Sequence, residues 1–272
     1  MTVSTGLDVL ANEGFARLAG RRVGALVHPA SVDRRLNHAV ALMQESGAVD
    51  LRALFGPQHG ILGQTQDNMV EWEGFTDRRT GVPVHSLYGK HRKPTPAMLD
   101  DIDILVIDLQ DVGARYYTFI WSMLLCLEAC AETGKSVLVL DRPNPLGGLR
   151  TEGTVLDTAY RSFVGLAPIP MRHGLTSGEL APFFARWSGW DLDLDVVAMT
   201  GWRRAMDFAA TGLPWVMPSP NMPTLDTARV YPGGCLLEGT NLSEGRGTTR
   251  PFELCGAPYG DSPGLLESLN RM

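Results

Sequence analysis

Three loops of this sequence carry the polar residues that could do chemistry, and each follows an apolar run typical of a β-strand. Gln58 and His59 come after the first of these runs. Asp108 and Asp111 lie at and beyond the end of the second, and Asn144 follows the third. Carboxylates, amides and imidazoles bind hydroxyl groups and move protons. These loops are therefore candidates for acid–base chemistry or for recognition of a small polar ligand.

Each of these residues also has a purely structural reading. Asp108 and Asp141 could cap helices or bond loop amides, and Arg115 and Arg142 could pair with them. For any single residue the structural reading is favoured. The three loops together favour a site, because the carboxyl ends of parallel strands meet along one edge of a sheet.

The strands that would position these loops follow from the hydrophobic pattern. Short runs rich in β-forming residues alternate with helical segments, the longest helix being expected at about 117–133. Two runs are continuously apolar, which is typical of a parallel sheet covered on both faces. We therefore predict an α/β fold with a Rossmann-like, doubly wound, mostly parallel sheet. The strands are expected at 23–27, 51–55, 82–87, 102–109, 137–140 and 194–199.

Two helix ends are also predicted. Gly134 is expected to close the long helix, since glycine adopts the left-handed conformation that often follows a last turn. Thr176 and Glu179 have the spacing of a capping box, which predicts the start of another helix.

Composition excludes several functional classes. The chain has 272 residues, 44% of them apolar and 20% charged, and a formal net charge of -6. These values are typical of a globular protein, and a negative charge offers no general attraction for nucleic acid. The longest uncharged apolar stretch, 116–127, is shorter than the roughly 20 residues of a membrane helix. No basic segment followed by an apolar run opens the chain, so a cytoplasmic location is expected.

Cofactor motifs are absent from the sequence. No phosphate-binding glycine motif follows the first strand, where His28-Pro29-Ala30-Ser31 stands instead. His28, His59 and His173 do not share the spacing of metal ligands. No nucleotide, metal or other cofactor is therefore expected. Cys126 and Cys130 share one face of the long helix and are expected to be core thiols.

The last third of the chain holds its densest polar segments, 218–224 and 237–250. Loops rich in Asn, Glu, Arg and Thr can bond sugar hydroxyls, acetamido groups or a carboxylate, and their glycines let backbone amides approach a ligand. A sugar-binding loop and a solvated loop are equally compatible with this composition.

Seven stretches, spread in order through nearly the whole chain, match one known family. They are FGPQHGILG (55–63), DLQDVGARYYTF (108–119), DRPNPLGG (141–148), EGTVLD (152–157), PMRHGLTSGEL (170–180), PSPNMPT (218–224) and YPGGCLLEGTNLSEGRGTTRPFE (231–253). Through them the chain resembles the bacterial exo-β-N-acetylmuramidases of the NamZ or YbbC type, a family formerly described only as a domain of unknown function. The resemblance implies a Rossmann-like domain that carries the active site and a smaller C-terminal α/β domain that helps to form the cleft. It also implies release of N-acetylmuramic acid from the non-reducing ends of peptidoglycan fragments, in cell-wall turnover and recycling.

The sequence departs from the family pattern at two points. The family loop typically reads P-E-H-G, and its Glu is the favoured catalytic residue, whereas this chain has Gln58. An amide does not titrate in the useful range, so either another carboxylate serves or the protein hydrolyses poorly or not at all. The alternative carboxylates are Asp67, Glu71 and Glu73 on the following loop, Asp108 and Asp111 on the neighbouring one, and, further away, Glu152 and Glu244. Family members also usually continue further, so we expect a Rossmann-like domain at 1–225 followed, at 226–272, by a linker and the beginning of a truncated C-terminal domain.

The resemblance and the polar loops together assign roles. The expected catalytic group is Gln58, His59, Asp108 and Asp111. The expected substrate-binding group, with Arg for the lactyl carboxylate of muramic acid, is Arg115, Tyr116, Asn144, Glu152, His173, Asn221, Glu238, Asn241, Glu244, Arg246 and Arg250. The alternatives are a sugar-binding pseudoenzyme, in which Gln58 replaces the acid, and a plain Rossmann-like nucleotide-binding domain.

Overall fold

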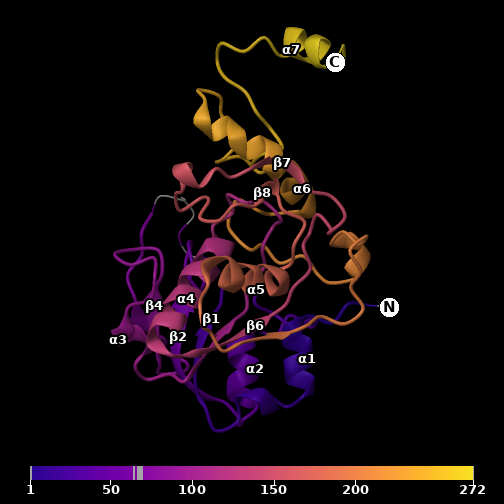
Figure 1. Ribbon diagram of the computed structural model, residues 1–272. Helices are drawn as coiled ribbons and strands as arrows, with labels where there is room; N and C mark the ends of the chain where they lie inside the picture. The colour runs from indigo at the N-terminus through magenta and orange to yellow at the C-terminus, as the bar shows by residue number, and fades with distance from the viewer. Residues whose placement is uncertain (1, 64, 66–69, 272) are drawn as a thin grey trace.

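The computed structural model of the chain describes residues 2–63, 65 and 70–271 (Figure 1). Its helices are α1 (Gly6–Asn12), α2 (Ala39–Glu45), α3 (Pro96–Leu99), α4 (Phe119–Thr133), α5 (Ser177–Ser188), α6 (Leu225–Gly234) and α7 (Ser262–Leu269). Its strands are β1 (Arg22–Leu26), β2 (Asp50–Gly56), β3 (Phe75–Thr76), β4 (Pro83–Ser86), β5 (Ile104–Ile107), β6 (Ser136–Leu140), β7 (Glu152–Val155), β8 (Pro170–Arg172) and β9 (Leu194–Val197).

The central sheet has the strand order β3-β4-β2-β1-β5-β6-β9. All its neighbouring pairs are parallel except β3–β4 at one edge. Without β3, the order along the chain is 3-2-1-4-5-6, which is the order of a Rossmann fold. The predicted α/β class and mostly parallel sheet are therefore confirmed.

Helices cover both faces of this sheet, as the continuous apolar strands require. In Figure 1, α4 and α5 lie above the sheet and α1 and α2 below it. On the first face, the rings of Trp121 in α4 and Phe184 in α5 lie 5.6 Å apart and are fully buried. On the second face, Leu10 of α1 and Met43 of α2 belong to a separate buried cluster that includes Val106 of β5. The core is thus two apolar layers separated by the sheet.

Both predicted helix ends are confirmed. Gly134 follows α4 with a φ of 65° and donates its backbone N–H to the carbonyl of Cys130. Thr176 and Glu179 form the capping box that starts α5. Cys126 and Cys130 are buried on α4, as expected of core thiols.

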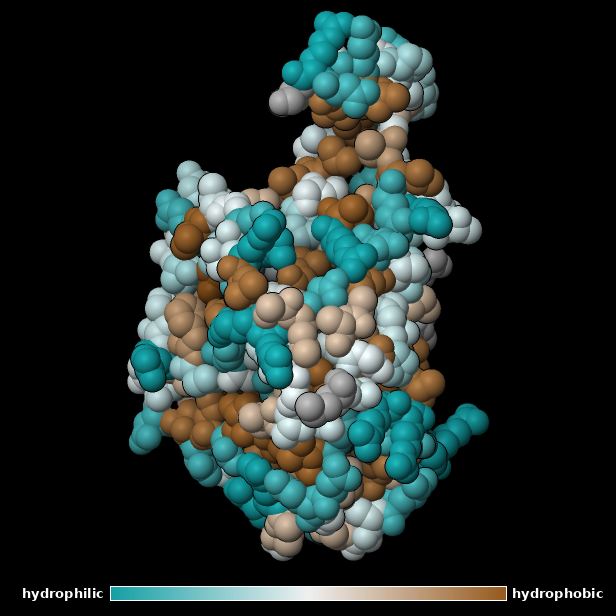
Figure 2. Space-filling view, turned by 90° about the vertical axis from the view of Figure 1, so that its right-hand side faces the viewer, coloured by the Kyte–Doolittle hydropathy of each residue, from teal (hydrophilic) through white to brown (hydrophobic). Residues whose placement is uncertain are grey.

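The later part of the chain adds a two-stranded antiparallel sheet, β7–β8, and the helices α6 and α7. Helix α7 has no buried residue and stands away from the main body (Figure 1). Figure 2 shows hydrophobic side chains on this segment and on the stalk that joins it to the body. The exposed apolar side chains of α7 are Leu265, Leu266 and Leu269.

Candidate functional site

A cavity of about 580 Å³ lies beyond the carboxyl ends of β2 and β4 and beside the start of α4. Its walls come from segments that are far apart in the sequence, including the loops after β2 and β4, the residues that begin α4, the loop at 162–164, the loop at 219–222 and the short 3-10 helix Cys235–Gly239. This is the edge of the sheet where ligands bind in open α/β folds. Its volume falls within the usual range for small-molecule sites.

Gln58 and His59 line this cavity. The buried Gln58 accepts a hydrogen bond at Oε1 from the hydroxyl of Thr118, at 2.6 Å. His59 has a left-handed backbone with a φ of 70°, and its Nδ1 lies 2.7 Å from the carbonyl oxygen of Thr65. Because a carbonyl only accepts hydrogen bonds, Nδ1 must be the donor, which leaves Nε2 as the acceptor of a neutral ring.

The tight turn that presents these two side chains depends on Gly56 at the end of β2. A Cβ atom at this position would lie 2.7 Å from the Trp72 ring and 2.9 Å from the backbone nitrogen of Ile61. Only glycine fits there without a shift in the backbone or the indole. The turn that carries Gln58 and His59 therefore requires glycine at position 56.

The structure places Asp108 away from the cavity. Its carboxylate is fully buried and binds the guanidinium of Arg142 through both oxygens, at 2.5 and 2.8 Å. Arg142 also donates to the carbonyl of Val32, at 2.9 Å. This bidentate pair ties the loops after β1, β5 and β6 together, as the structural reading of Asp108 expects.

Asp111 and His173 form a second buried pair outside the cavity wall. Oδ2 of Asp111 lies 3.0 Å from Nε2 of His173 and accepts the backbone N–H of Gly113 at 2.7 Å. Nδ1 of His173 accepts the N–H of Leu175 at 3.2 Å, so Nε2 carries the proton and donates to Asp111. The pair connects two loops, and neither residue belongs to the lining of the cavity.

Arg115, Asn144 and Glu152 are likewise engaged in structural contacts. Arg115 donates to the carbonyls of Thr154 and Ile169, at 2.6 and 2.9 Å. The nearly fully buried Asn144 amide bonds the backbone of its own loop and of the segment before α5. Glu152 is exposed and pairs with Arg172 on the partner strand β8, at 2.6 Å. The structure does not bring these three to the cavity.

Four of the expected substrate-binding residues do line the cavity. They are Tyr116, Asn221, Glu238 and Arg246. Three others lie outside it and are occupied elsewhere: the Asn241 carbonyl accepts the hydroxyl of Tyr259, Glu244 contacts Arg246, and Arg250 pairs with Glu253. The polar segment at 237–250 is therefore partly a wall of the site and partly a folded loop of its own.

Arg246 is held by two carboxylates at the cavity wall. Its guanidinium lies 2.7 Å from Glu238 and 3.0 Å from Glu244, and 4.9 Å from the centre of the Phe252 ring. Of the two carboxylates, Glu238 lines the cavity. Within the described parts of the chain, Glu238 is the carboxylate that the cavity wall presents.

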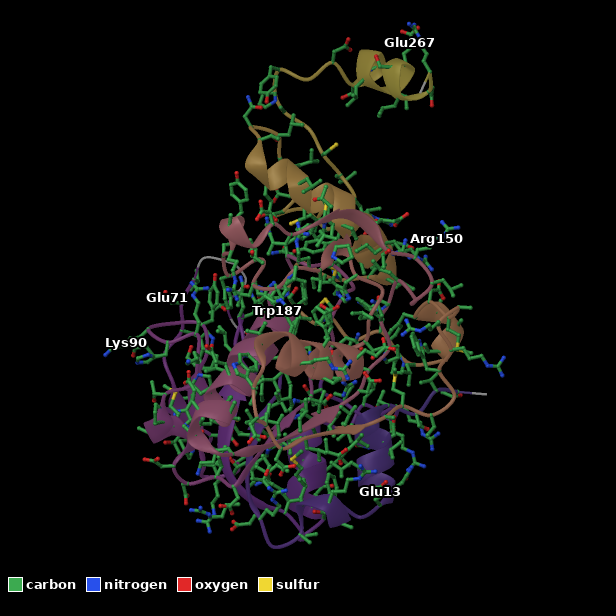
Figure 3. All side chains as sticks on the ribbon, in the orientation of Figure 1. Glu13, Glu71, Lys90, Arg150, Trp187 and Glu267 are labelled. Carbon is green, nitrogen blue, oxygen red and sulfur yellow. The ribbon has the colours of Figure 1, made fainter. Side chains whose placement is uncertain are left out.

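The carboxylates that follow Gln58 in sequence do not take this place. Glu71 and Glu73 are exposed, and Figure 3 shows Glu71 at the outer edge of the body. Between them, the buried Trp72 donates its indole N–H to the carbonyl of Pro57, which turns its neighbours outward. Asp67 lies outside the described residues.

Aromatic residues form much of the remaining wall, and the sequence reasoning did not single them out. Tyr117 and Tyr231 are packed edge to face, with ring centres 5.9 Å apart, and Tyr231 meets Phe252 in the same way at 4.8 Å. Burial raises the pKa of both tyrosine hydroxyls, so they stay neutral. Tyr88, Arg92 and Phe163 complete another part of the wall. Of these residues, Tyr88 follows a predicted strand, and Tyr117, Tyr231 and Phe252 lie in the stretches that carry the family resemblance.

The crevice where a Rossmann fold holds a nucleotide is filled by protein side chains. In this strand order it lies between β1 and β5, and here His28 occupies it. Nε2 of His28 accepts the N–H of Gln110 at 2.9 Å, and Nδ1 donates to the carbonyl of Pro218 at 3.2 Å. Burial lowers the pKa of His28 to about 3. A neutral histidine thus closes the position that a phosphate would need.

No group of three or more His, Cys, Asp or Glu side chains is arranged to hold a metal ion among the residues that the structure describes. None of their helices is long and apolar enough to cross a membrane.

Fold and cavity together define an α/β protein of Rossmann topology whose ligand site lies beside the closed nucleotide position and is walled by aromatic and polar side chains. The chain belongs to the NamZ family. The family models described as "Exo-beta-N-acetylmuramidase NamZ, N-terminal" and "C-terminal" match residues 23–226 and 229–272. The resemblance found in the sequence is thereby confirmed.

Known relatives agree with this assignment. The peptidoglycan beta-N-acetylmuramidase NamZ of Bacillus subtilis (strain 168) is 51% identical over 270 residues, which are 99% of this chain and 65% of the relative. The present chain thus spans just under two thirds of that protein. Two solved DUF1343 family proteins from Bacteroides fragilis NCTC 9343 share the fold, with TM-scores of 0.92 and 0.81 and identities of 43% and 35%. The alignments cover 99% and 95% of this chain and 69% and 68% of those structures.

Proposed function

We propose that this chain is an exo-acting glycoside hydrolase that releases N-acetylmuramic acid from the non-reducing end of peptidoglycan-derived glycans. The observation that carries the proposal is membership of the NamZ family, together with 51% identity to a relative named as a peptidoglycan beta-N-acetylmuramidase. The biological setting that fits this reaction is cell-wall turnover and recycling. The substrate is a small or oligomeric sugar that ends in N-acetylmuramic acid.

The cavity suits such a sugar. A volume of about 580 Å³ accommodates one or two sugar rings. Aromatic faces such as those of Tyr117 and Tyr231 pack against the apolar C–H groups of a pyranose, while Asn221 and Ser219 offer hydrogen bonds to its hydroxyl and acetamido groups.

Hydrolysis of a glycoside needs one group that protonates the leaving oxygen and one that activates water or attacks the sugar. Two cavity-lining residues in the described structure are of types that act as general acids and bases in enzymes, the Glu238 carboxylate and the His59 imidazole. We assign the proton transfers to these two residues. Gln58 is assigned to orient the substrate, since the amide held by Thr118 can bond but cannot titrate.

The direct test is release of 4-nitrophenol from its β-N-acetylmuraminide by the purified 272-residue protein. Turnover of this substrate, with the matching β-N-acetylglucosaminide as the comparison, is the expected result. A glycan whose only muramic acid lies inside the chain is expected to stay intact. Cleavage of that glycan at the internal muramic acid would contradict the exo-acting assignment. Absence of release from every muraminide would overturn the proposed activity.

A further inference from the structure

Arg92 holds an unusual position in the cavity wall. Its guanidinium carbon lies 4.3 Å from the centre of the Tyr88 ring and 4.4 Å from the centre of the Phe163 ring. The two ring centres are 5.9 Å apart, so the guanidinium lies in the angle between the rings. Contact with both rings fixes the plane and direction of the charged group, which a flexible surface arginine would lack.

The charge of Arg92 is not balanced by a carboxylate within the described residues. Arg246, the other cavity-lining arginine, already contacts both Glu238 and Glu244. The neighbouring Lys93 is turned away toward α4, where it pairs with Glu128 and Glu132. The cavity thus holds one neutralised guanidinium and one that remains available to an anion.

We propose that Arg92 binds the carboxylate of the ligand and so determines specificity for lactyl-bearing sugars, an inference that rests on the proposed function. N-acetylmuramic acid differs from N-acetylglucosamine only in the 3-O-lactyl ether, which ends in a carboxylate. A planar guanidinium with a fixed direction forms two parallel hydrogen bonds with such a group. The two arginines that the sequence analysis expected in this role, Arg246 and Arg250, are instead paired with the protein's own carboxylates.

This assignment has a consequence for substrate choice. The lactyl carboxylate is an anion only when no peptide is attached, because a stem peptide converts it into an amide. An amide is neutral and cannot accept the charge-assisted pair of bonds from a guanidinium. Arg92 therefore selects glycans from which the peptides have been removed.

The test compares Arg92→Gln with Lys93→Gln, which removes an adjacent positive charge that faces away from the cavity. Three 4-nitrophenyl β-glycosides are used: the muraminide with its lactyl carboxylate, its lactyl amide, and the glucosaminide. Arg92→Gln is expected to raise KM for the acid by about 10-fold or more, as expected for loss of a charge-assisted hydrogen bond, and to leave the amide and glucosaminide within about 2-fold. Lys93→Gln is expected to leave KM unchanged for all three substrates. An equal rise of KM for all three substrates, or the same rise in both variants, would overturn the role of Arg92.

Binding measurements separate this inference from the proposed activity. Calorimetric titration of the full chain with N-acetylmuramic acid and with N-acetylglucosamine is expected to show a preference for the acid that Arg92→Gln removes. If no glycoside is cleaved but this preference and its loss are seen, the inference holds and the activity fails. If the muraminide is cleaved but Arg92→Gln keeps the preference, the activity holds and the inference fails. Arg92→Lys, which keeps the charge and the stem, replaces Gln if the melting temperature falls, and it is expected to retain part of the preference.

Discussion

The hydroxyl of Thr118, just before the first turn of α4, donates a 2.6 Å hydrogen bond to Oε1 of Gln58 in the loop after β2. The bond joins two walls of the cavity through side chains 60 positions apart in the sequence. A carboxylate could accept the same bond, and a helix N-terminus favours negative charge nearby. The site is therefore built in a way that tolerates glutamate at position 58.

Gln58→Glu is expected to fold normally and to raise kcat for a muraminide by about 100-fold, since a positioned acid or base commonly contributes this much. The measurement is 4-nitrophenol release by the variant and the unmodified protein across pH. The control is Gln44→Glu, which makes the same chemical change on the exposed side of α2. Unchanged kcat in Gln58→Glu would contradict this expectation and would mean that other residues, such as Glu238 and His59, already supply both proton transfers.

Glu238 and Glu244 allow a matched test of the assigned proton-transfer group. Both contact Arg246, at 2.7 and 3.0 Å, but only Glu238 belongs to the cavity wall among the described residues. Glu238→Gln is expected to lower kcat by about 100-fold or more, and Glu244→Gln by less than about 3-fold. Equal effects of the two substitutions would mean that the pair acts only by holding Arg246, and the catalytic assignment of Glu238 would fail.

Local patterns in the sequence were sufficient to predict most of the fold. The continuous apolar runs of β5 and β6 predicted a parallel sheet, and the capping box at Thr176 predicted the start of α5. The sequence analysis missed α1, although Thr5 and Asp8 form a capping box there as well. It also missed β7 and β8, whose side chains are exposed or half-buried and so leave no apolar pattern.

The site was harder to predict, for a physical reason. Strand ends predict where loops meet, and this placed Gln58 and His59 correctly beside the cavity. The same rule cannot tell whether a polar side chain faces a ligand or binds its own loops, as Asp108 and Asn144 do. It also cannot find a contact such as that between Arg92 and Phe163, which depends on packing between distant segments.

The buried pair of Asp108 and Arg142 is expected to act on stability. Asp108→Asn would leave the guanidinium without its countercharge, since Arg142 is only 5% exposed and Asp108 fully buried. The free energy of unfolding is expected to fall by about 3 to 5 kcal/mol. Urea titration followed by circular dichroism measures the change. Glu267→Gln, whose pair with Arg271 is exposed, serves as the control and is expected to cost less than about 1 kcal/mol. Similar losses in both variants would contradict the structural role of Asp108.

His28 makes stability depend on pH in a predictable direction. Its pKa falls to about 3 in the folded protein, mainly because burial disfavours the charged ring and secondly because Arg142 lies nearby. The unfolded chain binds a proton at His28 below a pH of about 6.5, whereas the folded protein does not until about pH 3. The free energy of unfolding is therefore expected to decrease as the pH falls through this window, by up to about 1.4 kcal/mol per pH unit.

Asp141 acts in the opposite direction over part of the same window. Burial raises its pKa to about 6, so the folded protein holds an extra proton between a pH of about 3.8 and 6, and acid favours the folded state there.

The His28 contribution to the pH dependence of stability is isolated by subtracting the pH profile of His28→Gln from that of the unmodified protein. Glutamine can accept from Gln110 and donate to Pro218, as the neutral ring does, but it does not titrate. The difference is expected to grow steadily as the pH is lowered from about 6.5 to 4.5. Parallel profiles of the two proteins would mean that His28 is already charged in the folded state, and the neutral closure of the crevice between β1 and β5 would be wrong.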